Sequence, residues 1–70
     1  MIIKRSITIK GHPTSISLED PFWNVLNSIA EARKISVASL VAEIDENRSS
    51  KQGYGLSSAV RVFVLNKVKE

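Results

Sequence analysis

The stretch TSISLEDPFW, residues 14–23, decides how the chain folds, because a strand pattern runs there directly into a helix start. In its first half, Ile16 and Leu18 alternate with serines at 15 and 17. A period of two is typical of a strand with one apolar face and, here, one hydroxyl-bearing face. Such a strand is not stable alone and must pair with another.

The second half of the stretch marks the start of a helix. Asp20 is expected to accept hydrogen bonds from the free amides of the first turn. Pro21 suits the first helical position because its missing N–H has no partner there in any case. The strand is therefore predicted to lead directly into an amphipathic helix.

A second alternating run, IIKRSITIK (residues 2–10), offers a partner strand. One of its faces carries Ile7 and Ile9, and the other carries Lys4, Ser6, Thr8 and Lys10. Gly11-His12-Pro13 ends the run. The simplest interpretation is a β-hairpin of residues 2–10 against 14–18, although the two strands could instead pair with other chains. Pro13 cannot donate to a ladder, so it is expected at the turn or on an edge.

Helix spacing covers residues 21–33 and again 36–46. The first helix presents Phe22, Leu26, Ile29 and Ala30 on one face, and Trp23 is expected in or beside the core. Between the helices, Lys34 is expected to adopt the left-handed conformation that ends a helix, at a cost of ~1 kcal/mol relative to Gly. Ser36 is predicted to cap the second helix.

Residues 57–69 are predicted to form a third helix, with Ser57 or Ser58 as its cap, although VRVFV (60–64) has equal strand propensity. The apolar residues on nearly every side fit a helix buried between two subunits. Arg61 is expected to pair with an acid of residues 19–47 or to reach solvent. The preceding residues, 47–56, have loop composition. A phosphate cradle at GYG (53–55) would lack the usual preceding strand and lysine.

Seventy residues predict one domain, 1–70, with a core of marginal stability. The chain has no Cys and one His, so neither a disulfide nor a metal site is expected to stabilise it. Association between chains is therefore the expected source of additional stability. No apolar run reaches the ~18 residues of a membrane span. The start, MIIKR, lacks the order of a signal peptide, and a cytoplasmic location is expected.

Charge is unevenly distributed along the chain, whose formal net charge is +3. Residues 1–18 carry three bases and no acid, whereas residues 19–47 carry six acids against Arg33 and Lys34. Residues 48–70 carry five bases against Glu70 alone. This asymmetry suggests one face suited to an anion. The alternative is an ordinary solvated surface.

The order of strand, helix, short connection and Ser-capped helix resembles the ribbon-helix-helix fold of the methionine repressor and Arc superfamily. Within this superfamily the chain more closely resembles short bacterial ribbon-helix-helix domain proteins, which share GHxTSxSLE, a Phe-Trp pair, LVAEID and LSSAxRVFVL. These motifs stand here at Gly11–Glu19, Phe22-Trp23, Leu40–Asp45 and Leu56–Leu65. One departure is Pro13, where the pattern commonly has Arg, and it removes a candidate base-contacting cation.

The resemblance implies an α+β fold and an obligate, intertwined homodimer. Strands from two chains would pair antiparallel into a ribbon that enters the DNA major groove. The implied base contacts are Ser15, Ser17 and His12. The implied phosphate contacts are Lys4, Arg5, Lys10, Lys34 and Ser36, the last at a helix N-terminus. The additional N-terminal strand could flank this ribbon or cover it.

The leading hypothesis is therefore a DNA-binding homodimer, or a higher oligomer, that acts as a small transcriptional regulator. One alternative is a dimeric interaction module without DNA binding, favoured by Pro13 and the modest charge. An antitoxin-like protein is another, although it usually needs a tail beyond the second helix. A nickel-type sensor would need His and Cys ligands that are absent. No enzyme, cofactor, small-molecule substrate or membrane partner is expected, because no catalytic set stands at usable spacing.

Overall fold

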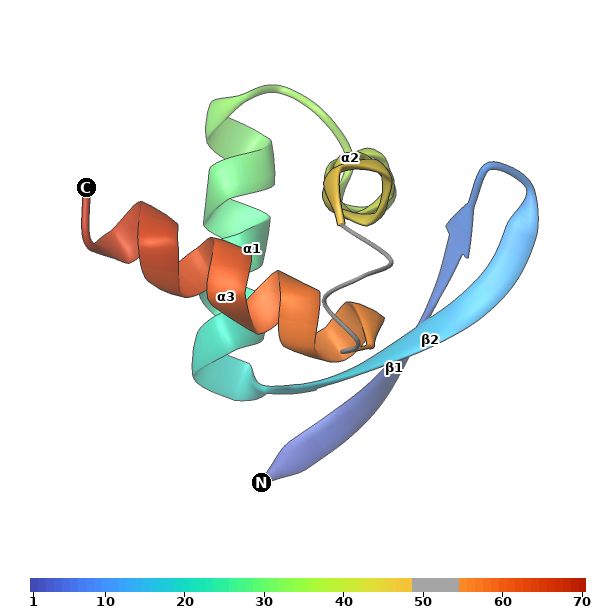
Figure 1. Ribbon diagram of the computed structural model, residues 1–70, viewed down its shortest axis with the longest axis horizontal. Coiled ribbons are helices and arrows are strands. Elements are labelled where there is room, and N and C mark those ends of the chain that lie inside the picture. Colours follow the sequence, from blue (N-terminus) through green and yellow to red (C-terminus); the bar gives the residue numbers. More distant parts are fainter. Residues whose placement is uncertain (49–54) are drawn as a thin grey trace.

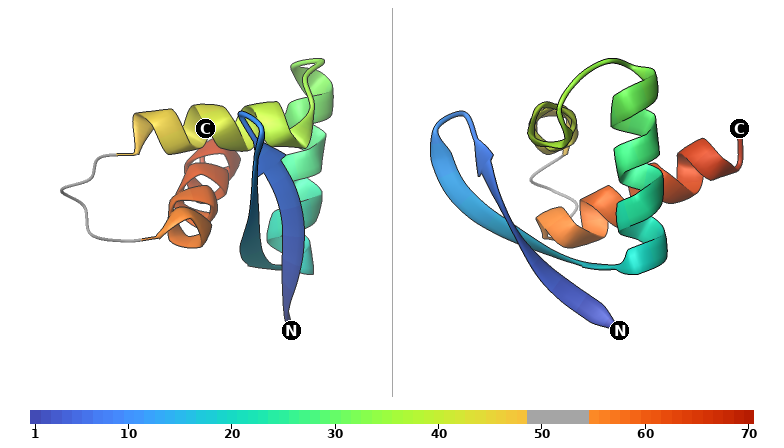
Figure 2. Two further views of the ribbon diagram at one scale, coloured as in Figure 1. Left: turned by 90° about the vertical axis from the view of Figure 1, so that its right-hand side faces the viewer. Right: turned by 180° about the vertical axis from the view of Figure 1, so that it is seen from behind.

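The computed structural model describes residues 1–48 and 55–70. An antiparallel hairpin, β1 (Ile2–Ile9) and β2 (His12–Glu19), is followed by three helices, α1 (Asp20–Ala32), α2 (Val37–Asn47) and α3 (Leu56–Val68). The hairpin lies along one side of the three helices (Figures 1 and 2). This order confirms the predicted α+β ribbon-helix-helix fold. Of the predicted loop 47–56, residues 49–54, including most of the GYG motif, lie outside the described part.

The predicted hairpin is confirmed, with a turn tighter than expected. Ile9 pairs with His12, so only Lys10 and Gly11 lie between the strands. Both have positive φ, 51° and 80°, which is the conformation of a type I′ turn. The strands therefore end at residue 9 and begin again at residue 12, instead of the expected 10 and 14.

Pro13 lies inside β2, opposite Thr8. Its lack of an N–H removes no hydrogen bond between β1 and β2, because the backbone groups of alternate residues point to opposite edges of a strand. The N–H of Ser17, which has the same parity as Pro13, points away from β1 toward Ser57. Pro13 therefore directs its nitrogen to the outer edge of β2, as expected of a proline in a two-stranded sheet.

The start of α1 differs from the prediction by one residue. Glu19 occupies the N-cap position without a side-chain capping bond, and Pro21 lies within the first two helical positions. Asp20 is not a cap, which corrects the sequence interpretation. Its carboxylate binds Arg5 instead, at 2.5 Å, because the pairing of β1 with β2 brings that guanidinium to the helix start.

The connection between α1 and α2 follows the sequence prediction. Lys34 has a φ of 59°, its N–H bonds to the carbonyl of Glu31, and the next N–H, of Ile35, bonds to the carbonyl of Ala30. These two bonds form a Schellman motif with Lys in the position usually taken by Gly. Ser36 then caps α2 by accepting from the N–H of Ser39 at 3.0 Å, as predicted.

The third helix is confirmed as a helix, but its cap was predicted wrongly. Gly55 is the N-cap, and it has no side-chain capping bond. The hydroxyl of Ser57 is directed instead to the backbone of β2, where it accepts from the N–H of Ser17. Arg61 pairs with Glu19, at 3.0 Å, which confirms that it binds an acid of residues 19–47.

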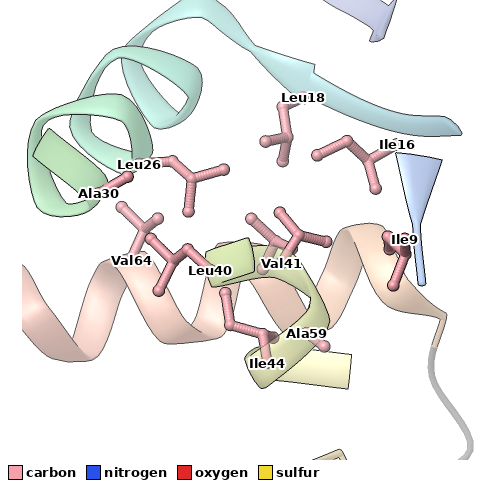
Figure 3. Close-up of a cluster of buried hydrophobic side chains, with 11 residues drawn as sticks. Ile9, Ile16, Leu18, Leu26, Ala30, Leu40, Val41, Ile44, Ala59 and Val64 are labelled. Carbon is pink, nitrogen blue, oxygen red and sulfur yellow. The ribbon is translucent and has the colours of Figure 1, made fainter. Parts of the chain in front are cut away.

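The core lies between the inner face of the hairpin and the three helices (Figure 3). Its buried side chains come from every element: Ile9, Ile16, Leu18, Leu26, Ala30, Leu40, Val41, Ile44, Ala59, Val60 and Val64. Trp23 packs against this core, as predicted, and Phe63 and Ile29 are partly buried beside it. Thus side chains from both strands and all three helices of one chain form a common core. The apolar side chains left exposed on α3 are Val62, Leu65 and Val68.

Candidate nucleic-acid interface

The outer face of the hairpin is the surface directed away from the helices. Side chains alternate between the two faces of a strand, and the buried Ile9, Ile16 and Leu18 identify the inner face. The paired residues on the outer face are Ile2 with Glu19, Lys4 with Ser17, Ser6 with Ser15, and Thr8 with Pro13. All are exposed except Ser17 and Glu19, which are half-buried. Glu19, at the end of β2, is paired with Arg61, and we call the six residues of the other three pairs the ribbon face.

Hydroxyl groups predominate on the ribbon face. Four of its six side chains are hydroxyls, one is an ammonium group, and none is a carboxylate. A hydroxyl both donates and accepts hydrogen bonds. Two strands lie about 4.8 Å apart, so the hairpin is narrow enough for a DNA major groove, which is about 12 Å wide. The ribbon face therefore has both the width and the hydrogen-bonding groups to approach base edges.

The structure brings together two of the three residues expected to contact bases. Ser15 and Ser17 lie side by side on the ribbon face. His12 does not join them, because it pairs with Ile9 and so belongs to the opposite face at the hairpin tip. It lines a shallow hollow there with Lys10 and Arg48.

Lys4 and Arg5, both expected to contact phosphates, lie on opposite faces. Lys4 belongs to the ribbon face. Arg5 stands opposite Ile16, and its guanidinium lies 4.6 Å from the centre of the Trp23 ring, besides binding Asp20. Its side chain is only 19% exposed. Arg5 therefore fastens β1 to the start of α1 and is not free on the surface.

The remaining candidate phosphate contacts lie beyond the ribbon face. Lys10, at the hairpin tip, forms an ion pair with Glu46 of α2. Lys34 is exposed in the α1–α2 connection, at the far end of α1 from the hairpin junction (Figure 1). The hydroxyl of Ser36, next to it, is occupied by its bonds within the Ser36–Ser39 cap. The structure thus does not gather the predicted cations into one cluster.

Two members of the ribbon face, Ser6 and Thr8, were not among the predicted contacts. The alternation of β1 already placed them in phase with Lys4. The register added that Ser6 lies opposite Ser15 and Thr8 opposite Pro13, which the sequence does not specify.

Arg61 of α3 binds two groups at the C-terminal end of β2. The Arg61 guanidinium donates to the Glu19 carboxylate at 3.0 Å and to the carbonyl of Ser17 at 2.8 Å. The main-chain N–H of Glu19 and then the Arg61 guanidinium hold the pKa of the Glu19 carboxyl below its usual range. This acid at the end of the ribbon is therefore ionised at neutral pH, with its charge balanced by Arg61.

Residues 1–48 and 55–70 contain no group of three or more acidic or His side chains that could hold a metal ion. No helix in these ranges has the length and apolar character needed to cross a membrane.

The chain has a strand that pairs in an antiparallel ribbon and leads directly into a helix pair, which is the element order of a ribbon-helix-helix protein. The chain matches the family described as "Ribbon-helix-helix domain" over residues 2–68, and it belongs to that family. Domains of this family are generally DNA-binding regulatory modules, in transcription regulators and antitoxins, and not enzymes. No match was found among curated proteins or among solved structures.

Proposed function

We propose that this protein is a small transcription regulator that binds duplex DNA through the ribbon face and acts as a homodimer in the cytoplasm. The observation that carries the proposal is the ribbon face itself, a set of mostly exposed hydroxyls with Lys4, on a face whose one carboxylate, Glu19, is balanced by Arg61. The family membership supports it, because ribbon-helix-helix domains generally bind DNA.

Base contacts are assigned to Ser15 and Ser17, with Ser6 and Thr8 beside them. A serine or threonine hydroxyl can bond to several bases, so discrimination by each contact is modest. His12 is assigned to the edge of the contact at the hairpin tip. The expected operator is therefore short and tolerant of substitutions.

Phosphate contacts are assigned to Lys4, Lys10 and Lys34, with the capped N-terminus at Ser36. Lys4 and Lys34 have no ion pair within the described residues. The pair of Lys10 with Glu46 is exposed, with side chains 60% and 56% accessible, and such pairs contribute little. A phosphate can therefore replace Glu46 at little cost. Arg5 supports the ribbon from the other face.

The homodimer is assigned to the exposed apolar residues of α3. Val62, Leu65 and Val68 are 44%, 53% and 63% exposed. Val62 and Val68 each lie three residues from Leu65. If α3 packed antiparallel against its copy, Val62 of one chain would lie opposite Val68 of the other, and the two Leu65 residues would face each other. This self-complementarity is what a two-fold interface requires. An apolar groove lies beside these residues of α3 and is lined on the α1 side by Pro21, Phe22 and Val25.

The proposal is tested by titrating duplex DNA at several salt concentrations. Four to six phosphate contacts in a dimer give a slope of about −4 to −5 in log affinity against log salt. Lys4→Ala should reduce the magnitude of that slope by about two per dimer, one for each chain. A slope near zero, or no binding at low salt, would favour a protein-interaction module instead. The exposed apolar residues of α3 would then be its candidate interaction surface.

A further inference from the structure

The ribbon face changes in chemistry along its length. Lys4 lies at one end, two serines face each other in the middle, and Thr8 lies opposite Pro13 at the end next to the turn. Lys4 and Thr8 are four residues apart in an extended strand, which is about 13 Å. Successive base pairs of B-DNA rise by about 3.4 Å. The two ends of the ribbon face therefore reach different base pairs of a duplex that it contacts.

The end next to the turn is the least polar part of the ribbon face. The side chain of Pro13 has no polar atom, and Thr8 carries a methyl group beside its hydroxyl. The N–H of Ser17 points away from β1, and Pro13 has the same parity, so Thr8 and Pro13 form a pair without hydrogen bonds between them. The Cα atoms of such a pair lie about 4.5 Å apart, closer than in a hydrogen-bonded pair. The proline ring therefore lies beside the Thr8 side chain, and together they form a small apolar surface.

This apolar surface is accessible. Thr8 and Pro13 are both exposed, and the hairpin turn lies at the margin of the molecule (Figure 1). A Cβ added at Gly11 in the turn would meet no atom of the described residues within 4 Å. A duplex can therefore approach this end of the ribbon face without displacing other parts of the described chain.

The opposite end of the outer face also carries an apolar side chain, Ile2, which is 56% exposed. Ile2 lies opposite Glu19, where β2 continues into α1. A duplex that approaches Ile2 meets this acid and the start of α1, whereas Thr8 and Pro13 have neither beside them. The end next to the turn is therefore the better apolar contact surface.

Thymine is the base that matches a small apolar surface in the major groove. It presents a 5-methyl group there, whereas guanine, adenine and cytosine present hydrogen-bonding groups and no methyl. Contact between a thymine methyl and an apolar group such as the threonine methyl is an established form of base readout. The serines in the middle of the ribbon face bond to several bases, so the apolar pair adds a discrimination that the hydroxyls do not supply.

We propose that Thr8 and Pro13 form a subsite for the methyl group of thymine and are specificity-determining residues of the ribbon face. The inference rests on the proposed function, because it requires the ribbon face to enter the major groove of duplex DNA. It gives the operator a thymine at the position that the end next to the turn contacts.

Deoxyuridine tests the proposal, because it differs from thymidine only in lacking the 5-methyl group. A duplex selected by the unmodified protein from a random library is synthesised again with each thymine replaced in turn by uracil. At least one replacement should weaken binding by about three- to fivefold, which is the contribution expected of one buried methyl group. A selected sequence without thymine, or one that tolerates uracil at every position, would overturn the proposal.

Variants of the pair show whether the methyl group is read at this place. Thr8→Ser/Pro13→Ala removes the apolar groups and retains the hydroxyl, so its affinities for the thymine and uracil duplexes should agree within about 1.5-fold. Thr8→Ser alone, which removes a single methyl group, should reduce the ratio to about twofold. Both positions are exposed, so the unfolding midpoints should change little. A full three- to fivefold ratio in the double variant would mean that another residue reads the methyl group.

Lys4→Ala is the matched control, at the other end of the same face. It should weaken binding to the thymine and uracil duplexes alike and leave their ratio unchanged. The two levels of the account also fail differently. If the unmodified protein binds no duplex at low salt, the proposed function fails and the subsite with it. If it binds with the expected salt dependence but does not distinguish thymine from uracil, the proposed function stands and the thymine subsite is wrong.

Discussion

The two faces of the hairpin differ in what they contribute, although they are built from alternate residues of the same two strands. The inner face places Ile9, Ile16 and Leu18 in the core, with exposures of 9%, 1% and 0%. The ribbon face carries hydroxyls and Lys4, all exposed except Ser17. The inner face contributes to the core, and substitutions at exposed positions usually change stability little. We therefore expect that the proposed base contacts can be altered with little effect on stability.

The largest difference in stability is expected between substitutions of Leu18, on the inner face, and of Ser15, on the ribbon face. Leu18→Ala should lower the free energy of unfolding by ~2–5 kcal/mol, because it leaves a cavity under the hairpin. Ser15→Ala, on the other face, should change it by about 0.5 kcal/mol or less. Urea unfolding followed by Trp23 fluorescence measures both. Similar losses for the two variants would mean that the ribbon face is buried.

Lys4 and Arg5 provide the same contrast for charge. Arg5→Ala should lower the free energy of unfolding by about 1 kcal/mol, since it removes the contact with Trp23 and the pair with Asp20. The salt dependence of DNA binding should be preserved in that variant. Lys4→Ala should leave the free energy of unfolding nearly unchanged and should reduce the salt dependence of DNA binding. If Arg5→Ala also flattens the salt dependence, Arg5 leaves Asp20 to bind phosphate.

A smaller effect is expected at Lys34, whose backbone is left-handed. Lys34→Gly should raise the free energy of unfolding by ~0.5–1 kcal/mol, because glycine relieves the strain of a positive φ. The same change should weaken DNA binding at every sequence alike, since it removes a proposed phosphate contact. Lys34→Ala is the control, which removes the charge and keeps the strain.

The smallest effect is expected from the pair of Glu19 with Arg61. The pKa of Glu19 is lowered in the folded protein, so the pair stabilises the fold above the usual glutamate range and is lost as pH falls through the folded pKa. The difference in unfolding midpoint between the unmodified protein and Glu19→Gln should shrink between about pH 5 and pH 3. A difference that stays constant over this range would rule out the ionised carboxylate as its source.

Local chemistry explains which parts of the fold were predictable. Alternation placed the two strands, and Ser36 and Lys34 marked the helix connection by capping and backbone preference. The cap of α3 was not predictable, because Ser57 is drawn to an N–H 40 residues away in the sequence. Likewise, the sequence does not distinguish Arg5 from the other N-terminal bases. Its contacts with Asp20 and Trp23 depend on how the strands pair and pack.

The candidate site was predictable to the same limited extent. The phase of the strand identified Ser15 and Ser17 as one polar set. Their neighbours across the hairpin depended on a two-residue turn that places Ser6 opposite Ser15. The distance of Lys34 and Ser36 from the ribbon face depended on the packing of α1, which no local pattern encodes.

The most direct test of the central claim compares the DNA sequences selected from a random duplex library by the unmodified protein and by Ser15→Ala/Ser17→Ala. The unmodified protein should enrich a preferred sequence. The variant should lose that preference, by ~1–3 kcal/mol for each base contact removed, while it keeps the phosphate-driven affinity. Its unfolding midpoint should be nearly unchanged. If the variant folds normally and selects the same sequence with the same preference, the ribbon face does not contact the bases.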